Sequence, residues 1–102
     1  MAITPNSGAE ISLEEAQKLI QNFQAKFPGE IKASFYGIET LNLILNQEGI
    51  IGVRIYYGYD SVAKKIAVVL VGVDSTGKDM TAILVDKGED CPNNCDITSP
   101  LY

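Results

Sequence analysis

The chain contains no histidine and no tryptophan, and Arg54 is its only arginine. The lack of histidine excludes imidazole general bases, serine–histidine and cysteine–histidine nucleophile pairs, and histidine metal ligands. The 102 residues carry eight basic and thirteen acidic groups, so the net charge is −5, and the basic residues are dispersed. Nucleic-acid phosphates require clustered lysine and arginine, and anionic membranes repel negative charge. We therefore expect neither a nucleic acid nor a membrane as partner.

Long apolar runs and cofactor motifs are missing too. The longest apolar run, residues 66–73, is well short of the ~18–20 residues that cross a bilayer. The first residues have neither the basic region nor the apolar region of a secretory signal, so we expect a cytoplasmic protein. The nine glycines occur singly and form neither a P-loop nor a dinucleotide-binding fingerprint, and no cofactor is expected.

Local patterns predict two helices. Ser12, followed three residues later by Glu15, forms a capping box in which each side chain bonds a free backbone N–H group. Apolar residues recur at helical spacing over residues 13–27, and the Pro-Gly pair that follows ends this helix. The same spacing predicts a second helix over residues 38–47. The apolar stripe of the first helix is expected to pack into the core.

The second half of the chain has the pattern of β-strands. A short strand is expected before the second helix, and three longer strands after it, joined by two hairpin turns: residues 31–36, 50–59, 66–74 and 80–86. The predicted fold is α+β, with two helices packed on one face of a three- or four-stranded antiparallel meander and an ordered C-terminal tail. Residues 1–11 are expected to be a flexible lead-in, and residues 12–102 a single domain.

The middle strand of the meander is apolar on both faces. Such a strand is usually buried on both sides, whereas the helices cover only one face of the sheet. The C-terminal tail or a second copy of the chain must therefore cover the other face, because an uncovered apolar face is an interaction site or an aggregation hazard. We favour a homodimer that packs sheet to sheet.

Arg54 and Tyr56 are candidate ligand-binding residues. They lie two positions apart in one predicted strand, so they point to the same face, and flanking glycines leave room around them. An arginine fork and a tyrosine hydroxyl can bind an anion or a carboxylate. The favoured alternative is structural: an arginine that stacks on the tyrosine ring and pairs with an acidic side chain.

Cys91 and Cys95 are the only cysteines, and their spacing matches neither a thioredoxin-like nor a zinc-knuckle motif. Four interpretations are open: two free thiols in an ordered tail, a local disulfide, a metal site, or a redox or catalytic thiol. A disulfide is disfavoured by a reducing cytosol, and a metal site needs further ligands, from Asp90, Asp96 or a second subunit. The acidic neighbours raise the thiol pKa, which makes catalysis the weakest of the four.

Three segments together resemble a group of small bacterial proteins without an established activity: residues 52–58 (GVRIYYG), residues 70–74 (LVGVD) and residues 91–101 (CPNNCDITSPL). The resemblance covers about residues 12–102. It implies one small stand-alone domain and assigns no site.

The sequence thus predicts a small, acidic, non-enzymatic binding or interaction module that forms a homodimer and whose partner is a protein or a small ligand. Two alternatives belong to other classes. One is a metal- or redox-linked protein that uses Cys91 and Cys95. The other is a small enzyme with an anion pocket at Arg54 and Tyr56, although no catalytic residue is identified.

Overall fold

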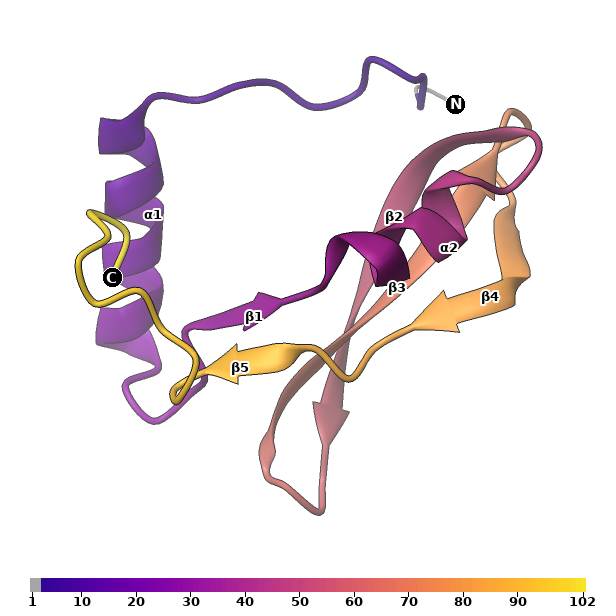
Figure 1. Ribbon diagram of the computed structural model, residues 1–102. Coiled ribbons are helices and arrows are strands. Elements are labelled where there is room, and N and C mark those ends of the chain that lie inside the picture. Colours follow the sequence, from indigo (N-terminus) through magenta and orange to yellow (C-terminus); the bar gives the residue numbers. More distant parts are fainter. Residues whose placement is uncertain (1–2) are drawn as a thin grey trace. The chain divides into compact units, whose positions relative to one another are not determined.

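The computed structural model describes residues 3–102 (Figure 1). Its contacts divide the chain into two compact units. Unit 1 comprises Tyr36–Gly88 and the described part of Met1–Gly8, and unit 2 comprises Ala9–Phe35 and Glu89–Tyr102. A single domain over residues 12–102 stays a prediction. No helix within residues 3–102 is long and apolar enough to cross a membrane.

The predicted α+β class is confirmed, with two helices and an antiparallel sheet of three strands, β2-β3-β4, plus a pair of short strands, β1-β5. The observed bounds lie within two residues of the predicted ones for every helix and strand that was expected. The elements are α1 (Leu13–Lys26), β1 (Ala33–Phe35), α2 (Ile38–Leu45), β2 (Ile50–Asp60), β3 (Lys65–Asp74), β4 (Asp79–Val85) and β5 (Glu89–Cys91).

Aspartate side chains build both hairpin turns of unit 1. Asp74 Oδ1 accepts hydrogen bonds from the backbone N–H groups of Thr76 at 2.9 Å and Lys78 at 3.1 Å, and Gly77 supplies the positive φ of 86° that the turn needs. Asp60 Oδ1 accepts from two loop amides in the β2–β3 turn, each at 3.0 Å. The Thr76 hydroxyl also donates to Asp74 Oδ1, at 2.6 Å, and this bond together with the backbone bonds holds the pKa of Asp74 below its ordinary value. The two backbone bonds to Asp60 lower the pKa of that carboxyl group in the same way.

The core of unit 1 lies between α2 and the sheet. Ile44 of α2, Leu70 of β3 and Val85 of β4 form one buried cluster. Gly72 lies two residues beyond Leu70 on the same face of β3. A Cβ atom at this glycine would lie 3.4 Å from Ile44 Cγ2 and 2.9 Å from Ile50 Cδ1. The missing side chain therefore allows α2 to approach the sheet closely.

The sequence predicted that β3 is buried on both faces along its whole length. In the structure only its second half is. Leu70 and Val71 point to opposite faces, and both are buried, whereas residues 65–69 are only partly buried. The reason is that α2 covers one face of this half only, so the distal half of the β2–β3 hairpin extends beyond it (Figure 1).

Unit 2 joins α1, the β1–β5 pair and the C-terminal segment. The predicted cap is present, since Glu15 N–H donates to Ser12 Oγ at 3.1 Å. The expectation that the apolar stripe of α1 is buried is wrong, because no residue of α1 is buried. Its polar side chains bind the C-terminal segment instead: Gln17 Nε2 donates to the carbonyl oxygen of Pro100 and Gln24 Nε2 to that of Tyr102, both at 3.1 Å.

The strand β5 was not predicted from the sequence. It pairs antiparallel with β1 through three residue pairs, Ala33↔Cys91, Ser34↔Asp90 and Phe35↔Glu89. The pairing is supported by a hydrogen bond from Ser34 Oγ to Asp90 Oδ1 at 3.0 Å. Glu and Asp have low β-propensity and no turn joins β5 to β1, so nothing local indicates β5.

Candidate functional site

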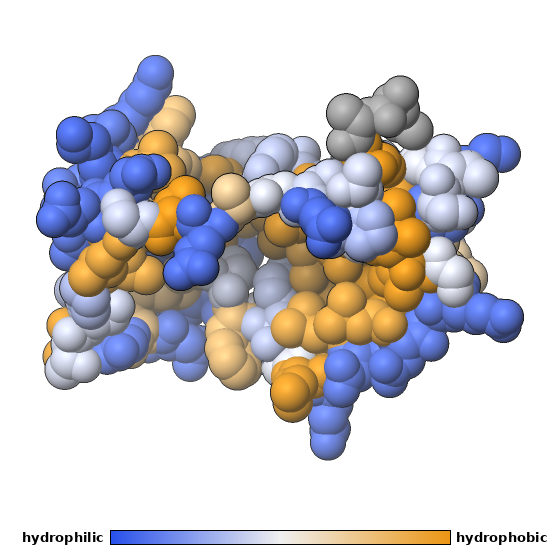
Figure 2. All heavy atoms as spheres, turned by 90° about the horizontal axis from the view of Figure 1, so that it is seen from above, coloured by the Kyte–Doolittle hydropathy of each residue, from blue (hydrophilic) through white to orange (hydrophobic). Residues whose placement is uncertain are grey.

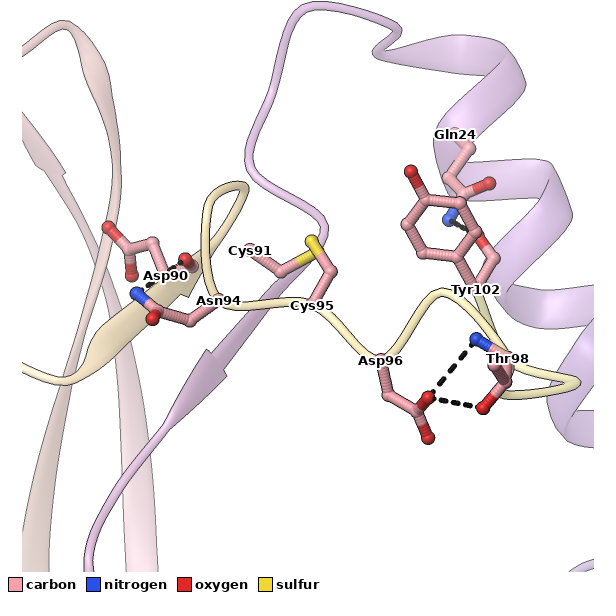
Figure 3. Close-up of a disulfide and its surroundings, with 8 residues drawn as sticks. All are labelled: Gln24, Asp90, Cys91, Asn94, Cys95, Asp96, Thr98 and Tyr102. Carbon is pink, nitrogen blue, oxygen red and sulfur yellow. Dashed lines mark hydrogen bonds between the residues drawn. A yellow bond between two sulfur atoms is a disulfide. The ribbon is translucent and has the colours of Figure 1, made fainter.

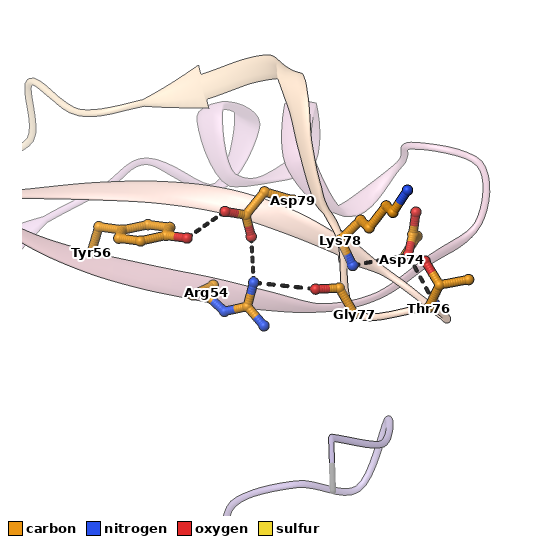
Figure 4. Close-up of polar contacts among 7 residues, drawn as sticks. All are labelled: Arg54, Tyr56, Asp74, Thr76, Gly77, Lys78 and Asp79. Carbon is orange, nitrogen blue, oxygen red and sulfur yellow. Dashed lines mark hydrogen bonds and ion pairs between the residues drawn. The ribbon is translucent and has the colours of Figure 1, made fainter. Parts of the chain in front are cut away.

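Arg54 and Tyr56 meet at one acidic side chain, Asp79 (Figure 4). Arg54 Nη1 lies 2.5 Å from Asp79 Oδ1 in a salt bridge, and the Tyr56 hydroxyl donates a hydrogen bond to Asp79 Oδ2. Arg54 Nη1 also lies 3.4 Å from the carbonyl oxygen of Gly77. Each carboxylate oxygen of Asp79 therefore has its own donor.

The register of the sheet brings these three residues together. Arg54 is paired with Val71, and Asp79 with Val73, so both side chains lie on the same face of the sheet, on either side of β3. Asp79 was not predicted as part of this site. The signal was available, because the turn after Asp74 fixes the register of β4 and hence the face to which Asp79 points.

Mutual hydrogen bonds shift the protonation equilibria in this cluster. The hydrogen bond from Tyr56, together with Arg54, lowers the pKa of Asp79 below its ordinary value of 3.8. The same hydrogen bond raises the pKa of Tyr56. Asp79 is therefore ionised and Tyr56 neutral at physiological pH. These contacts agree with the structural alternative for Arg54 and Tyr56, and ligand binding by the two together stays a prediction.

We expect the Asp79→Asn variant to be less stable than the wild type at neutral pH and equally stable in acid. Folding depresses the pKa of Asp79, so its ionic contacts stabilise the fold above pH ~4 and are lost as the pH falls through the folded-state value. Thermal midpoints of the wild type and the variant should thus differ at pH 7 and converge towards pH 2. The control is Glu48→Gln at an exposed position. A constant difference across this range would contradict the ionic role.

Cys91 and Cys95 form a disulfide with Cα atoms 4.9 Å apart (Figure 3). Of the four interpretations, the structure therefore has the disulfide, and neither cysteine is a free thiol. The two sulfur atoms are thus not available to a metal, and no group of three or more metal-ligating side chains occurs within residues 3–102. The cytoplasmic location stays a prediction.

The disulfide closes a turn at the end of β5. Within the turn, Asn94 N–H donates to the carbonyl oxygen of Asp90 at 2.9 Å. From outside the turn, Lys32 N–H donates to the carbonyl oxygen of Cys91 at 2.7 Å. Beyond it, Asp96 Oδ1 accepts from the N–H and hydroxyl groups of Thr98 at 3.1 and 2.6 Å, which lowers the pKa of Asp96 (Figure 3). The C-terminal segment is therefore ordered by successive local bonds, as predicted.

A third feature is a row of exposed apolar side chains on β2. Ile55 is paired with Leu70 and therefore shares the face that α2 covers, and Tyr57 and Tyr59 continue this row towards the hairpin turn. The exposed fractions are 49% for Ile55, 85% for Tyr57 and 63% for Tyr59. We name these three residues the β2 apolar row. Figure 2 shows apolar side chains gathered over the part of the molecule that holds the sheet and α2.

The position of this row differs from the expectation. An uncovered apolar surface was predicted on the face opposite the helices, whereas the β2 apolar row lies on the same face as α2. The opposite face carries the cluster of Arg54, Tyr56 and Asp79. On this face Val71 and Val73 are buried, whereas Leu84, which is paired with Val71, is 58% exposed.

No protein-family profile, curated protein or solved structure matches the chain. The resemblance to small bacterial proteins stays a prediction, and the geometry of the chain itself must support any function.

Proposed function

We propose that this protein is a non-enzymatic interaction module that forms a homodimer through the β2 apolar row. The observation that carries the proposal is the exposure of Ile55, Tyr57 and Tyr59 on one face of a regular strand. Tyrosine is enriched at the centres of protein interfaces, because its ring is apolar and its hydroxyl bonds at the rim. Neighbouring exposed aromatic residues on a rigid strand are typical of such surfaces.

A second copy of the chain fits this surface better than a charged partner. The three residues of the row are uncharged, so two copies can approach through it although each has a net charge of −5. An uncharged apolar row is self-complementary, which a two-fold symmetric interface requires. The non-enzymatic assignment is supported by the lack of histidine and by Asp79, which already bonds both Arg54 and Tyr56.

We expect Tyr57→Asp to raise the dimer dissociation constant at least ~10-fold, because the interface would then bury an unpaired charge next to its own symmetry mate. Sedimentation equilibrium over a concentration series measures this constant. Tyr57 is 85% exposed, so the variant keeps its fold.

Ile97→Asp provides the matched control, because Ile97 is 72% exposed and lies in unit 2, and the substitution adds the same charge. A wild-type protein that stays monomeric at high concentration would refute the proposal. Equal weakening of the dimer by both variants would show that charge alone, and not the β2 apolar row, controls association.

A further inference from the structure

The guanidinium group of Arg54 makes its hydrogen bonds to the protein through one of its terminal nitrogens. Both hydrogen bonds that it donates within residues 3–102 leave from Nη1, one to Asp79 and one to Gly77. Figure 4 shows the other terminal nitrogen turned away from Asp79, towards the side on which the N-terminal segment runs. A guanidinium has five N–H donors in a planar fork, so the N–H groups of Nε and Nη2 remain for another acceptor.

A cleft of about 200 Å³ adjoins Arg54 within unit 1. One wall is formed by the N-terminal segment, where Ser7 N–H donates to the carbonyl oxygen of Thr4 at 3.0 Å and so closes a turn. The other wall is formed by the start of β2 and by β3. Apart from Arg54 and the polar side chains of this turn, the lining is apolar: Ile3, Pro5, Ile51 and Val73.

We infer that this cleft binds a small aliphatic monocarboxylate, whose carboxylate accepts from the free side of Arg54 and whose short chain lies against the apolar walls. The planar fork of arginine matches the two oxygens of a carboxylate. Because Asp79 already balances the charge of Arg54, a single negative charge is favoured over a phosphate dianion. The volume lies below the ~300–1,000 Å³ of pockets for drug-sized ligands and limits the chain to a few carbons.

This site is independent of the proposed dimer. Arg54 and the β2 apolar row point to opposite faces of β2, because they occupy positions of opposite parity. Ligand binding and self-association can therefore be tested separately, and failure of one leaves the other standing.

Titration of the ¹⁵N-labelled full chain with sodium butyrate at constant ionic strength tests the inference. We expect saturable shifts of the amide signals of Gly52, Arg54 and Val73, with a Kd of ~1–10 mM for so small a ligand. 1-Butanol, which has the same chain without the charge, should bind at least ~10-fold more weakly. Equal binding of butanol, or shifts that never saturate, would overturn the inference.

Two variants identify the site. Arg54→Gln should weaken butyrate binding at least ~10-fold, but it also removes the partner of Asp79. Gly52→Val leaves that salt bridge intact. Gly52 lines the cleft on the same face as Arg54, and no atom lies within 4 Å of a Cβ built there, so valine fills the cleft without strain.

Gly52→Val should therefore abolish the saturable shifts while the rest of the spectrum stays folded. Gly29→Val is the control, since its Cβ would also meet open space but lies in unit 2. A folded Gly52→Val protein that binds butyrate as tightly as the wild type would place the ligand elsewhere and refute the assignment.

Discussion

Replacing Gly72 by valine should destabilise unit 1 by about 2 kcal/mol, because the added side chain occupies space that Gln47, Ile50 and Ile44 already fill. A Cβ atom at this position would lie 2.7 Å from Gln47 Nε2 and 2.9 Å from Ile50 Cδ1. Gln47 cannot move freely, since its Nε2 donates to the carbonyl oxygen of Ile44 at 3.1 Å. Alanine should cost less, because it adds no atoms beyond Cβ and the tip of Ile50 can shift.

Urea unfolding followed by tyrosine fluorescence measures this effect. The chain has no tryptophan, and four of its five tyrosines, at positions 36, 56, 57 and 59, lie in unit 1. Gly52→Val is the control on the neighbouring strand, where a side chain meets no atom within 4 Å. If both valine variants unfold at the same urea concentration, the close approach of α2 to Gly72 has no energetic weight.

The double substitution Cys91→Ser/Cys95→Ser should destabilise the C-terminal segment by about 2 kcal/mol. The disulfide joins residues four positions apart, and closing so short a loop raises the free energy of the unfolded chain by roughly this much, because it removes conformational entropy. The bond also fixes the end of β5, whose Cys91 carbonyl oxygen accepts from Lys32 N–H. Hydrogen exchange at Lys32 and Asn94 should accelerate roughly 30-fold.

Reduction of the wild type with dithiothreitol should give the same acceleration, whereas the double variant should not respond to the reductant. Amides of unit 1, such as Leu70, serve as the internal control because they lie outside the unit that holds the disulfide. Unchanged exchange at Lys32 and Asn94 after reduction would show that the hydrogen bonds alone order this segment.

The elements that the sequence predicted well are those whose signals are local. The capping box at Ser12 fixes the start of α1, and the aspartate at Asp74 with the glycine at Gly77 fixes the β3–β4 turn. Periodicity alone located β2, β3 and β4. The pairing of β1 with β5 could not be predicted, because the paired residues lie 54 to 58 positions apart and β5 carries no distinctive pattern.

The candidate site was predicted in part for the same reason. The shared direction of Arg54 and Tyr56 follows from the alternation of a single strand, whereas their link to Asp79 depends on the register of three strands. The wall that the N-terminal segment adds beside Arg54 depends on tertiary contacts, for which the sequence has no local signal. The disulfide was weighed as one of four alternatives, since spacing alone does not define the oxidation state of a cysteine pair.

The two glutamines of α1 hold the C-terminal segment through its main chain. Gln17 and Gln24 lie seven positions apart, about two helical turns, and so project from the same side of the helix. The carbonyl oxygens that they bind at Pro100 and Tyr102 belong to the backbone, which is the same whatever residue occupies those positions. The contact at position 100 should therefore survive sequence drift wherever the backbone path is kept, whereas Gln17 and Gln24 should resist exchange even for residues of similar size.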